Sequence, residues 1–160
     1  MRHTISVIVE NKAGVLSRVS NLFARRGFNI ESLAVGVTEN PGISRMTIVV
    51  EGDEQVLEQI IKQLYKLIDT IKVYDLPPDK SVSRELVLIK VGAAEKDRQE
   101  ITQIVDIFRG KIVDVADTSL TIEITGDEGK IAGAEKLLAK FGIRELVRTG
   151  KVSLQRGSAE

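Results

Sequence analysis

The fold is decided by residues 4–37, TISVIVENKAGVLSRVSNLFARRGFNIESLAVGV. The spacing of apolar residues in this stretch changes from that of a strand to that of a helix and then returns to that of a strand. Residues 4–9 alternate apolar and polar side chains, which is the two-residue period of a half-buried strand. Residues 15–26 carry apolar side chains at the spacing of one helix face, and Gly27 ends the helix behind two arginines that suit the negative end of its dipole. Residues 28–37 return to a strand pattern. The stretch therefore predicts strand, helix, strand.

The residues that follow complete one structural unit. Asn-Pro-Gly at residues 40–42 predicts a turn into a strand over residues 44–50. Two carboxylates at residues 53–54 favour the start of a second helix, and residues 68–74 predict a final strand. The order strand, helix, strand, strand, helix, strand is that of the split βαβ or ferredoxin-like unit, an antiparallel sheet with helices on one face.

The second half of the chain repeats this pattern after Pro77-Pro78-Asp79, which lacks amide donors and favours an extended linker. The predicted division is a domain over residues 1–76, a linker over 77–82 and a second domain over 83–160. In the second half we expect strands over 85–91, 111–115 and 120–125, helices over 99–108 and 131–141, and a last strand region over 143–154. The predicted fold class is α+β, with two ferredoxin-like βαββαβ domains in tandem.

The composition narrows the possible functions. The 160 residues include no cysteine, which excludes disulfides, thiolate nucleophiles and sulfur-bound zinc. Lys+Arg and Asp+Glu both number 23, so no net charge attracts the chain to nucleic acid or to acidic membranes. The chain has no continuous apolar stretch of the kind that a signal or a membrane span requires, and we expect a cytoplasmic protein.

Isolated polar residues give little sign of catalysis. His3 is the only histidine, and we interpret it as a surface residue at the start of a strand. The pairs Asp53-Glu54 and Asp127-Glu128 stand where helices begin, so we interpret them as helix-terminal carboxylates rather than as an acid and a base. Gly126-Asp127-Glu128-Gly129-Lys130 lacks the spacing of a phosphate loop and is better explained as a turn into a helix.

The loop over residues 11–14, Asn-Lys-Ala-Gly, is a candidate anion site. It joins a strand to a helix start, where unpaired amides and the helix dipole favour a carboxylate. Gly14 allows a ligand to approach the backbone closely, and Asn11 offers a side-chain amide. Val15, Leu16 and Ile30 are near enough in the pattern to cover a small aliphatic group. Asn and Gly are also typical of strand-to-helix turns that bind nothing, so both interpretations remain open at this point.

The strand over residues 28–37 is expected at a sheet edge, because the second strand of a split βαβ unit lies there. Its apolar side chains, Ile30, Leu33, Val35 and Val37, favour pairing with the same strand of a second copy across a two-fold axis. The alternative is an edge that Asn29 and Glu31 protect from pairing.

Three segments resemble the regulatory small subunits of acetolactate synthase, also called acetohydroxyacid synthase. They are NKAGVLSR at residues 11–18, RGFNIESL at 26–33 and SRMTI at 44–48. The resemblance continues through LEQI at 57–60, KQL at 62–64, REL at 84–86 and FRGKIVDV at 108–115, and so covers nearly the whole chain.

This resemblance implies an N-terminal ACT domain, which is a ferredoxin-like amino-acid sensor, and a C-terminal domain of related topology. It implies a regulatory subunit without a catalytic site of its own. It further implies a catalytic large subunit that uses thiamine diphosphate, magnesium and FAD, with no cofactor in this chain. The small subunit is then expected to raise the activity of that partner and to confer feedback inhibition, usually by valine, in branched-chain amino acid biosynthesis.

The resemblance also assigns the effector site by position. Asn11, Gly14, Val15 and Leu16 match the ligand loop of the family, and Asn29 and Ile30 match positions contributed by the neighbouring chain of a homodimer. Asn40 replaces the more usual acidic residue of the turn. Two rival functions are a stand-alone enzyme on a ferredoxin-like fold and an RNA-binding module, although only 4% of residues are aromatic.

Overall fold

The computed structural model describes residues 1–157, which form two compact units. The first unit contains residues up to Val82 together with the described residues from Lys151 onward, and the second contains Ser83–Gly150. The predicted second domain ran continuously from residue 83 to 160; the structure instead returns the chain to the first unit at Lys151. Residues 158–160 of that prediction lie outside the described residues.

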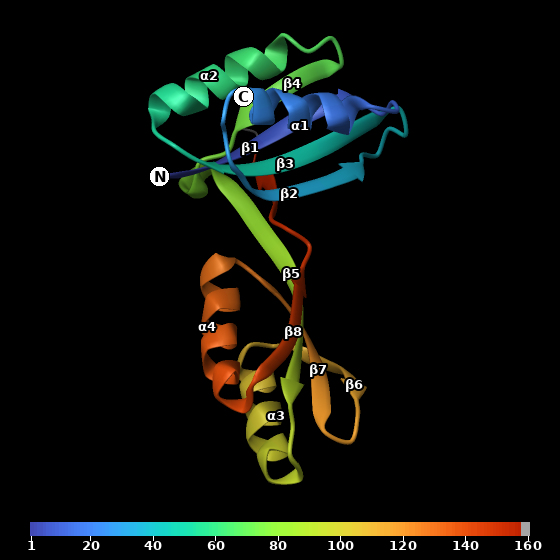
Figure 1. Ribbon diagram of the computed structural model, residues 1–160, viewed down its shortest axis with the longest axis vertical. Helices are drawn as coiled ribbons and strands as arrows, with labels where there is room; N and C mark the ends of the chain where they lie inside the picture. Colours follow the sequence, from blue (N-terminus) through green and yellow to red (C-terminus); the bar gives the residue numbers. More distant parts are fainter. Residues whose placement is uncertain (158–160) are drawn as a thin grey trace. The chain divides into compact units, whose positions relative to one another are not determined.

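The first unit is a four-stranded antiparallel sheet with two helices on one face (Figure 1). Its strands lie in the order β2-β3-β1-β4, which puts β2 at an edge as the sequence predicted. The elements are β1 (Arg2–Glu10), α1 (Val15–Arg25), β2 (Ile30–Val37), β3 (Ile43–Glu51), α2 (Glu54–Tyr65) and β4 (Thr70–Asp75).

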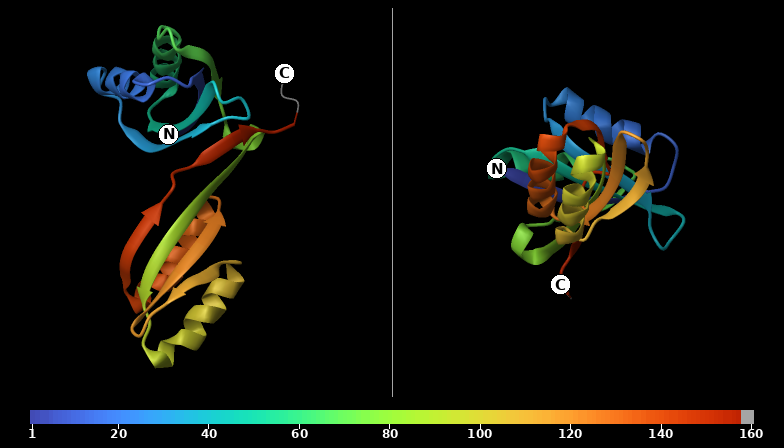
Figure 2. Two further views of the ribbon diagram at one scale, coloured as in Figure 1. Left: turned by 90° about the vertical axis from the view of Figure 1, so that its right-hand side faces the viewer. Right: turned by 90° about the horizontal axis from the view of Figure 1, so that it is seen from below.

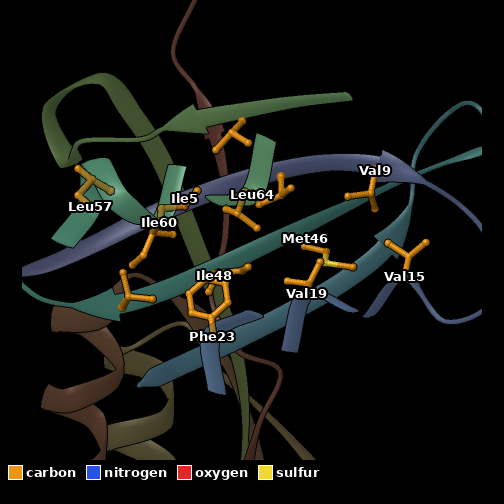
Figure 3. Close-up of a cluster of buried hydrophobic side chains, with 13 residues drawn as sticks. Ile5, Val9, Val15, Val19, Phe23, Met46, Ile48, Leu57, Ile60 and Leu64 are labelled. Carbon is orange, nitrogen blue, oxygen red and sulfur yellow. The ribbon is translucent and has the colours of Figure 1, made fainter. Parts of the chain in front are cut away.

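The core of the first unit lies between the sheet and the two helices. Alternate residues of β1 and β3 meet the apolar faces of α1 and α2, and Figure 3 shows Phe23, Ile48 and Ile60 gathered in this core. Phe23 ends the buried face of α1, and its carbonyl accepts a hydrogen bond from the Phe28 amide, while Gly27 has the positive φ of 70° that this C-terminal cap requires. The sequence therefore ends α1 where the core needs the chain to turn into β2.

The second unit repeats this layer arrangement. Its sheet has the order β6-β7-β5-β8, and α3 and α4 lie side by side in the right-hand view of Figure 2. The elements are β5 (Ser81–Gly92), whose first two residues belong to the first unit, α3 (Arg98–Ile107), β6 (Lys111–Val115), β7 (Ser119–Gly126), α4 (Glu128–Leu138) and β8 (Ile143–Arg148), with short 3-10 turns at Glu95–Asp97 and Ala139–Phe141. A further 3-10 turn, Pro78–Lys80, belongs to the first unit. A separate apolar core fills the space under its helices.

Three local expectations were wrong. The last strand region is two strands, β8 and β9 (Val152–Gln155), because Gly150 takes a positive φ of 85° between them. The prolines enter a short 3-10 turn at Pro78–Lys80 rather than an extended linker. His3 is buried rather than on the surface, and its Nε2 lies 3.0 Å from the carbonyl oxygen of Gly52.

The C-terminal segment lies on the first sheet. The Lys151 amide donates to the Ser32 hydroxyl of β2 at 3.0 Å, and the Lys151 ammonium donates to the Thr4 hydroxyl of β1 at 3.4 Å. The Arg156 amide and guanidinium donate to the carbonyls of Lys80 and Ser81 at the start of β5, with which β9 pairs. These polar contacts hold the end of the described chain in the first unit.

The aspartate of each acidic pair caps a helix and the glutamate lies in the first turn, as the sequence predicted. Asp53 accepts a hydrogen bond from the Val56 amide at the start of α2, and Asp127 accepts one from the Lys130 amide at the start of α4. Asp53→Ala is expected to lower the free energy of unfolding by about 1 kcal/mol, since it removes this cap. Urea unfolding checks it, with Asp127→Ala as the matched variant of the second unit. Unchanged stability in Asp53→Ala would contradict the capping role.

Candidate functional site

The loop over residues 11–14 connects β1 to α1 and opens the N-terminus of that helix. Gly14 is the residue before the helix and has φ 85° and ψ −7°, a left-handed conformation that glycine adopts without strain. No side chain caps α1, in contrast to α2 and α4. The Val15 amide donates to the Lys12 carbonyl at 3.4 Å, so the amides of Leu16 and Ser17 are the first-turn donors that, with the helix dipole, can stabilise a carboxylate.

Asn11 fixes the loop against the turn between β2 and β3. Its backbone amide donates to the Gly42 carbonyl at 2.8 Å, and its side-chain nitrogen donates to the Pro41 carbonyl at 2.9 Å. This leaves the side-chain oxygen of Asn11, which accepts no hydrogen bond from the described residues, to receive a donor such as an ammonium group. The side-chain amide of Asn11, predicted as a ligand group, thus also links this loop to the turn between β2 and β3.

Two charged pairs frame the same loop. Lys12 Nζ lies 2.7 Å from Glu10 Oε2, and the hydrogen bond and negative charge of Glu10 raise the pKa of the lysine above its ordinary value. Arg18, one turn into α1, contacts the buried carboxylate of Asp69 through Nε at 2.8 Å and Nη2 at 2.7 Å. This two-point contact anchors the first turn of α1 to the connection that leads into β4.

The apolar residues of the site have different surroundings. Val15 is buried and belongs to the core, so it supports the loop from beneath. Leu16 is 44% exposed and presents an aliphatic surface beside the loop. Of the two, only Leu16 presents a surface that a ligand can cover from solvent.

Asn29 and Ile30 lie at the other end of the sheet from the loop. Ile30 pairs with Val50, whereas Val37 pairs with Ser44 beside the turn that Asn11 contacts. Seven residue steps of a strand separate Ile30 from Val37, or about 23 Å. Within one chain, therefore, the structure brings together Asn11, Gly14, Val15 and Leu16 but not Asn29 and Ile30.

Antiparallel pairing of β2 with β2 of a second copy changes this arrangement. Such pairing places the Ile30 end of one strand against the Val37 end of the other, because the two strands run in opposite directions. Whether the six predicted residues form one site therefore depends on a second copy, which belongs to the proposal below.

The sequence did not predict the parts that Asp69 and Pro41 play in this site. Arg18 lies within the segment at residues 11–18, but its partner Asp69 is 51 positions away, and no local pattern marks it. Pro41 was predicted as part of a turn and not as the acceptor for Asn11. Both contacts depend on how distant segments pack together.

Other kinds of site have little support in the part of the chain that the structure describes. Residues 1–157 contain no group of three or more His, Cys, Asp or Glu side chains placed to hold a metal ion. Among the same residues, no helix has the length and apolar content needed to cross a membrane.

Known proteins similar to this chain identify its family. A model described as an AHAS small subunit-like ACT domain matches residues 5–72, and a model of the small subunit of acetolactate synthase matches residues 84–157. A probable acetolactate synthase small subunit of Archaeoglobus fulgidus is 58% identical over 158 residues, which are 99% of each chain. The chain belongs to the acetolactate synthase small-subunit family. This confirms the family and the ACT domain that the sequence predicted.

Further members of the family agree. The acetolactate synthase small subunit of Mycobacterium leprae is 55% identical over 97% of this chain and 92% of its own. A crystal structure of the acetolactate synthase small subunit from Thermotoga maritima matches with a TM-score of 0.92 and 48% identity, over 98% of each chain. The small-subunit fold, two tandem ferredoxin-like units, therefore extends over essentially the whole chain.

Proposed function

We propose that this small subunit binds the catalytic large subunit of acetolactate synthase in the cytoplasm, raises its activity, and makes it sensitive to inhibition by valine or a related branched-chain amino acid. Thiamine diphosphate, magnesium and FAD belong to the catalytic partner, and so does the active site. The observation that carries the effector role is the N-terminus of α1 behind Gly14, which no side chain caps, in the same loop as Asn11, whose side-chain nitrogen is bonded to Pro41.

An amino acid suits this loop because its two charged ends need opposite partners. The carboxylate is received by the first-turn amides of α1, and the ammonium donates to the side-chain oxygen of Asn11. Leu16, with Asn29 and Ile30 from the second copy, covers the aliphatic side chain. One methylene changes affinity by only about 1–3 kcal/mol, so valine, leucine and isoleucine compete for one pocket.

The homodimer forms through β2, whose free edge supports the proposal. Val35 and Val37 on this strand are 47% and 59% exposed in the single chain. The carboxylate of Glu31 lies 2.7 Å from Arg2 Nε, so its charge is balanced within its own unit and does not prevent strand pairing. Pairing of the two edges gives a continuous sheet and covers the apolar side chains.

Co-purification with the catalytic subunit from the same cell, followed by assays with and without valine, tests this function. We expect the complex to be more active than the catalytic subunit alone and to lose that activity as valine rises. The isolated small subunit should show no turnover of pyruvate. Turnover by the isolated chain would instead support the stand-alone enzyme, and failure to bind the catalytic subunit would contradict the proposal.

A further inference from the structure

A groove of 410 Å³ runs between α1 and α2 of the first unit. Its lining does not include the loop over residues 11–14, although Arg18 lines the groove and also lies close to Gly14. It is lined by one face of α1 and by the C-terminal end of α2: Arg18, Asn21, Leu22, Arg25, Arg26, Gln63, Lys66 and Leu67.

The lining is basic. Four of its eight residues carry a positive charge and none is acidic. Arg18 is paired with Asp69, whereas Arg25, Arg26 and Lys66 have no ion-pair partner among residues 1–157. Because Lys+Arg and Asp+Glu balance over the whole chain, this groove is a local concentration of positive charge.

The internal repeat indicates that the fold does not require the arginines of α1. The bond from the Phe28 amide to the Phe23 carbonyl has its counterpart in the bond from the Gly110 amide to the Val105 carbonyl, 82 positions later. At the same shift, the α1 residues of the groove correspond to Glu100, Gln103, Ile104, Ile107 and Phe108. The equivalent face of α3 thus has no cation, whereas Lys66 of α2 corresponds to Lys140 at the 74-position shift between the capping residues Asp53 and Asp127. The basic face of α1 is therefore a feature of the first unit beyond what folding needs.

The groove also offers apolar contacts, which favours a polypeptide over a small anion. Leu22 and Leu67 are partly buried against the core and contribute apolar surface to the lining. Ile68, next to Leu67 in the chain, is 93% exposed. Protein interfaces combine such an apolar contact with charged groups that pair across a rim, whereas an inorganic ion uses only the charges.

We propose that this groove docks an acidic segment of the catalytic subunit, an inference that rests on the proposed regulatory function. The guanidinium groups of Arg25 and Arg26 match carboxylates by two-point hydrogen bonding, and Lys66 adds a point charge from the facing helix. Ile68 packs against an apolar residue that flanks the acidic segment. This surface holds the catalytic partner, while the loop over residues 11–14 binds the effector.

The test reverses two groove charges, Arg25→Glu with Lys66→Glu, and measures affinity for the purified catalytic subunit at low and moderate salt. We expect affinity to fall by about 10-fold to 100-fold and its salt dependence to weaken, because like charges then face the acidic segment. Lys96→Glu with Lys136→Glu is the matched control: both lysines are exposed, and Lys136 lies in the last turn of α4 as Arg25 does in α1. The control should bind like the wild type.

The outcomes separate this inference from the function on which it rests. Arg25→Gln with Lys66→Gln, which only removes the charges, should bind between the wild type and the reversal variant, and thermal unfolding should show all variants folded. Wild-type affinity in the reversal variant overturns the groove proposal and leaves the regulatory function standing. The groove proposal is also overturned if affinity is unchanged but stabilisation by inorganic phosphate is lost, since that result marks a small-anion site. A wild-type chain that binds no catalytic subunit overturns the regulatory function itself.

Discussion

Replacing Gly14 with aspartate is expected to weaken valine binding by one to several powers of ten while activation of the catalytic subunit persists. The new side chain adds a β-carbon at a backbone φ of 85°, where L-residues are strained. It also puts a carboxylate beside the helix start proposed to receive the carboxylate of valine. If strain and repulsion each contribute about 1–2 kcal/mol, the loss of affinity follows. Calorimetry on the isolated small subunit measures it.

The surroundings of Gly14 define the control. A β-carbon at this position would lie 3.1 Å from Arg18 Nη1, so the arginine attracts the introduced carboxylate and keeps it at the helix start. Gly14→Ala adds the strain without the charge and should lose about half as much binding free energy, about 1–2 kcal/mol. Normal valine affinity in Gly14→Asp would show that the loop is not the effector site. A folded Gly14→Asp chain that neither binds valine nor activates would show that the two functions share a surface.

Val35→Lys is expected to weaken the homodimer by about 2–4 kcal/mol, because it puts an unpaired charge into an apolar strand pairing. Sedimentation at falling protein concentration measures the dissociation. Valine affinity should fall together with dimerisation, since in the proposed homodimer Asn29 and Ile30 reach the loop over residues 11–14 only from the second copy.

The opposite edge of the same sheet supplies the control. Ile71 on β4 is 50% exposed, close to the value for Val35, and Ile71→Lys changes the same kind of residue at the other edge strand. Ile71→Lys should leave both association and valine binding unchanged. An intact dimer in Val35→Lys would place the interface elsewhere, and dissociation without loss of valine affinity would show that one chain suffices for the site.

Local signals explain why most of the fold could be predicted. Gly27 and the apolar face of α1 fix where the helix ends, and Asp53 and Asp127 mark helix starts through bonds within one turn. The predictions that were wrong concern contacts between residues far apart in the sequence. Nothing near His3 announces its contact with Gly52, and the separation of β9 from β8 depends on where Lys151 and Arg156 find acceptors in the first unit.

In the candidate site too, local features could be predicted and contacts between distant residues could not. Gly14 was predicted from its place between a strand and a helix, and the structure gives it the left-handed conformation that suits the position. The second bond that holds the loop, from Asn11 to Pro41, joins residues 30 positions apart. The distance between Ile30 and the loop could not be seen without the strand register, because alternation shows which face a residue occupies and not which end of the sheet it occupies.

In the proposed homodimer, the position of Ile30 at the far end of β2 makes valine binding depend on the concentration of the small subunit. When two chains complete each pocket, every dimer carries two pockets and a lone chain carries none. By thermodynamic linkage, valine then tightens the dimer by the same factor by which dimerisation tightens valine. At concentrations below the dimer dissociation constant, valine potency therefore rises with the amount of small subunit. Newly made chains become responsive to feedback only once enough of them have accumulated to meet.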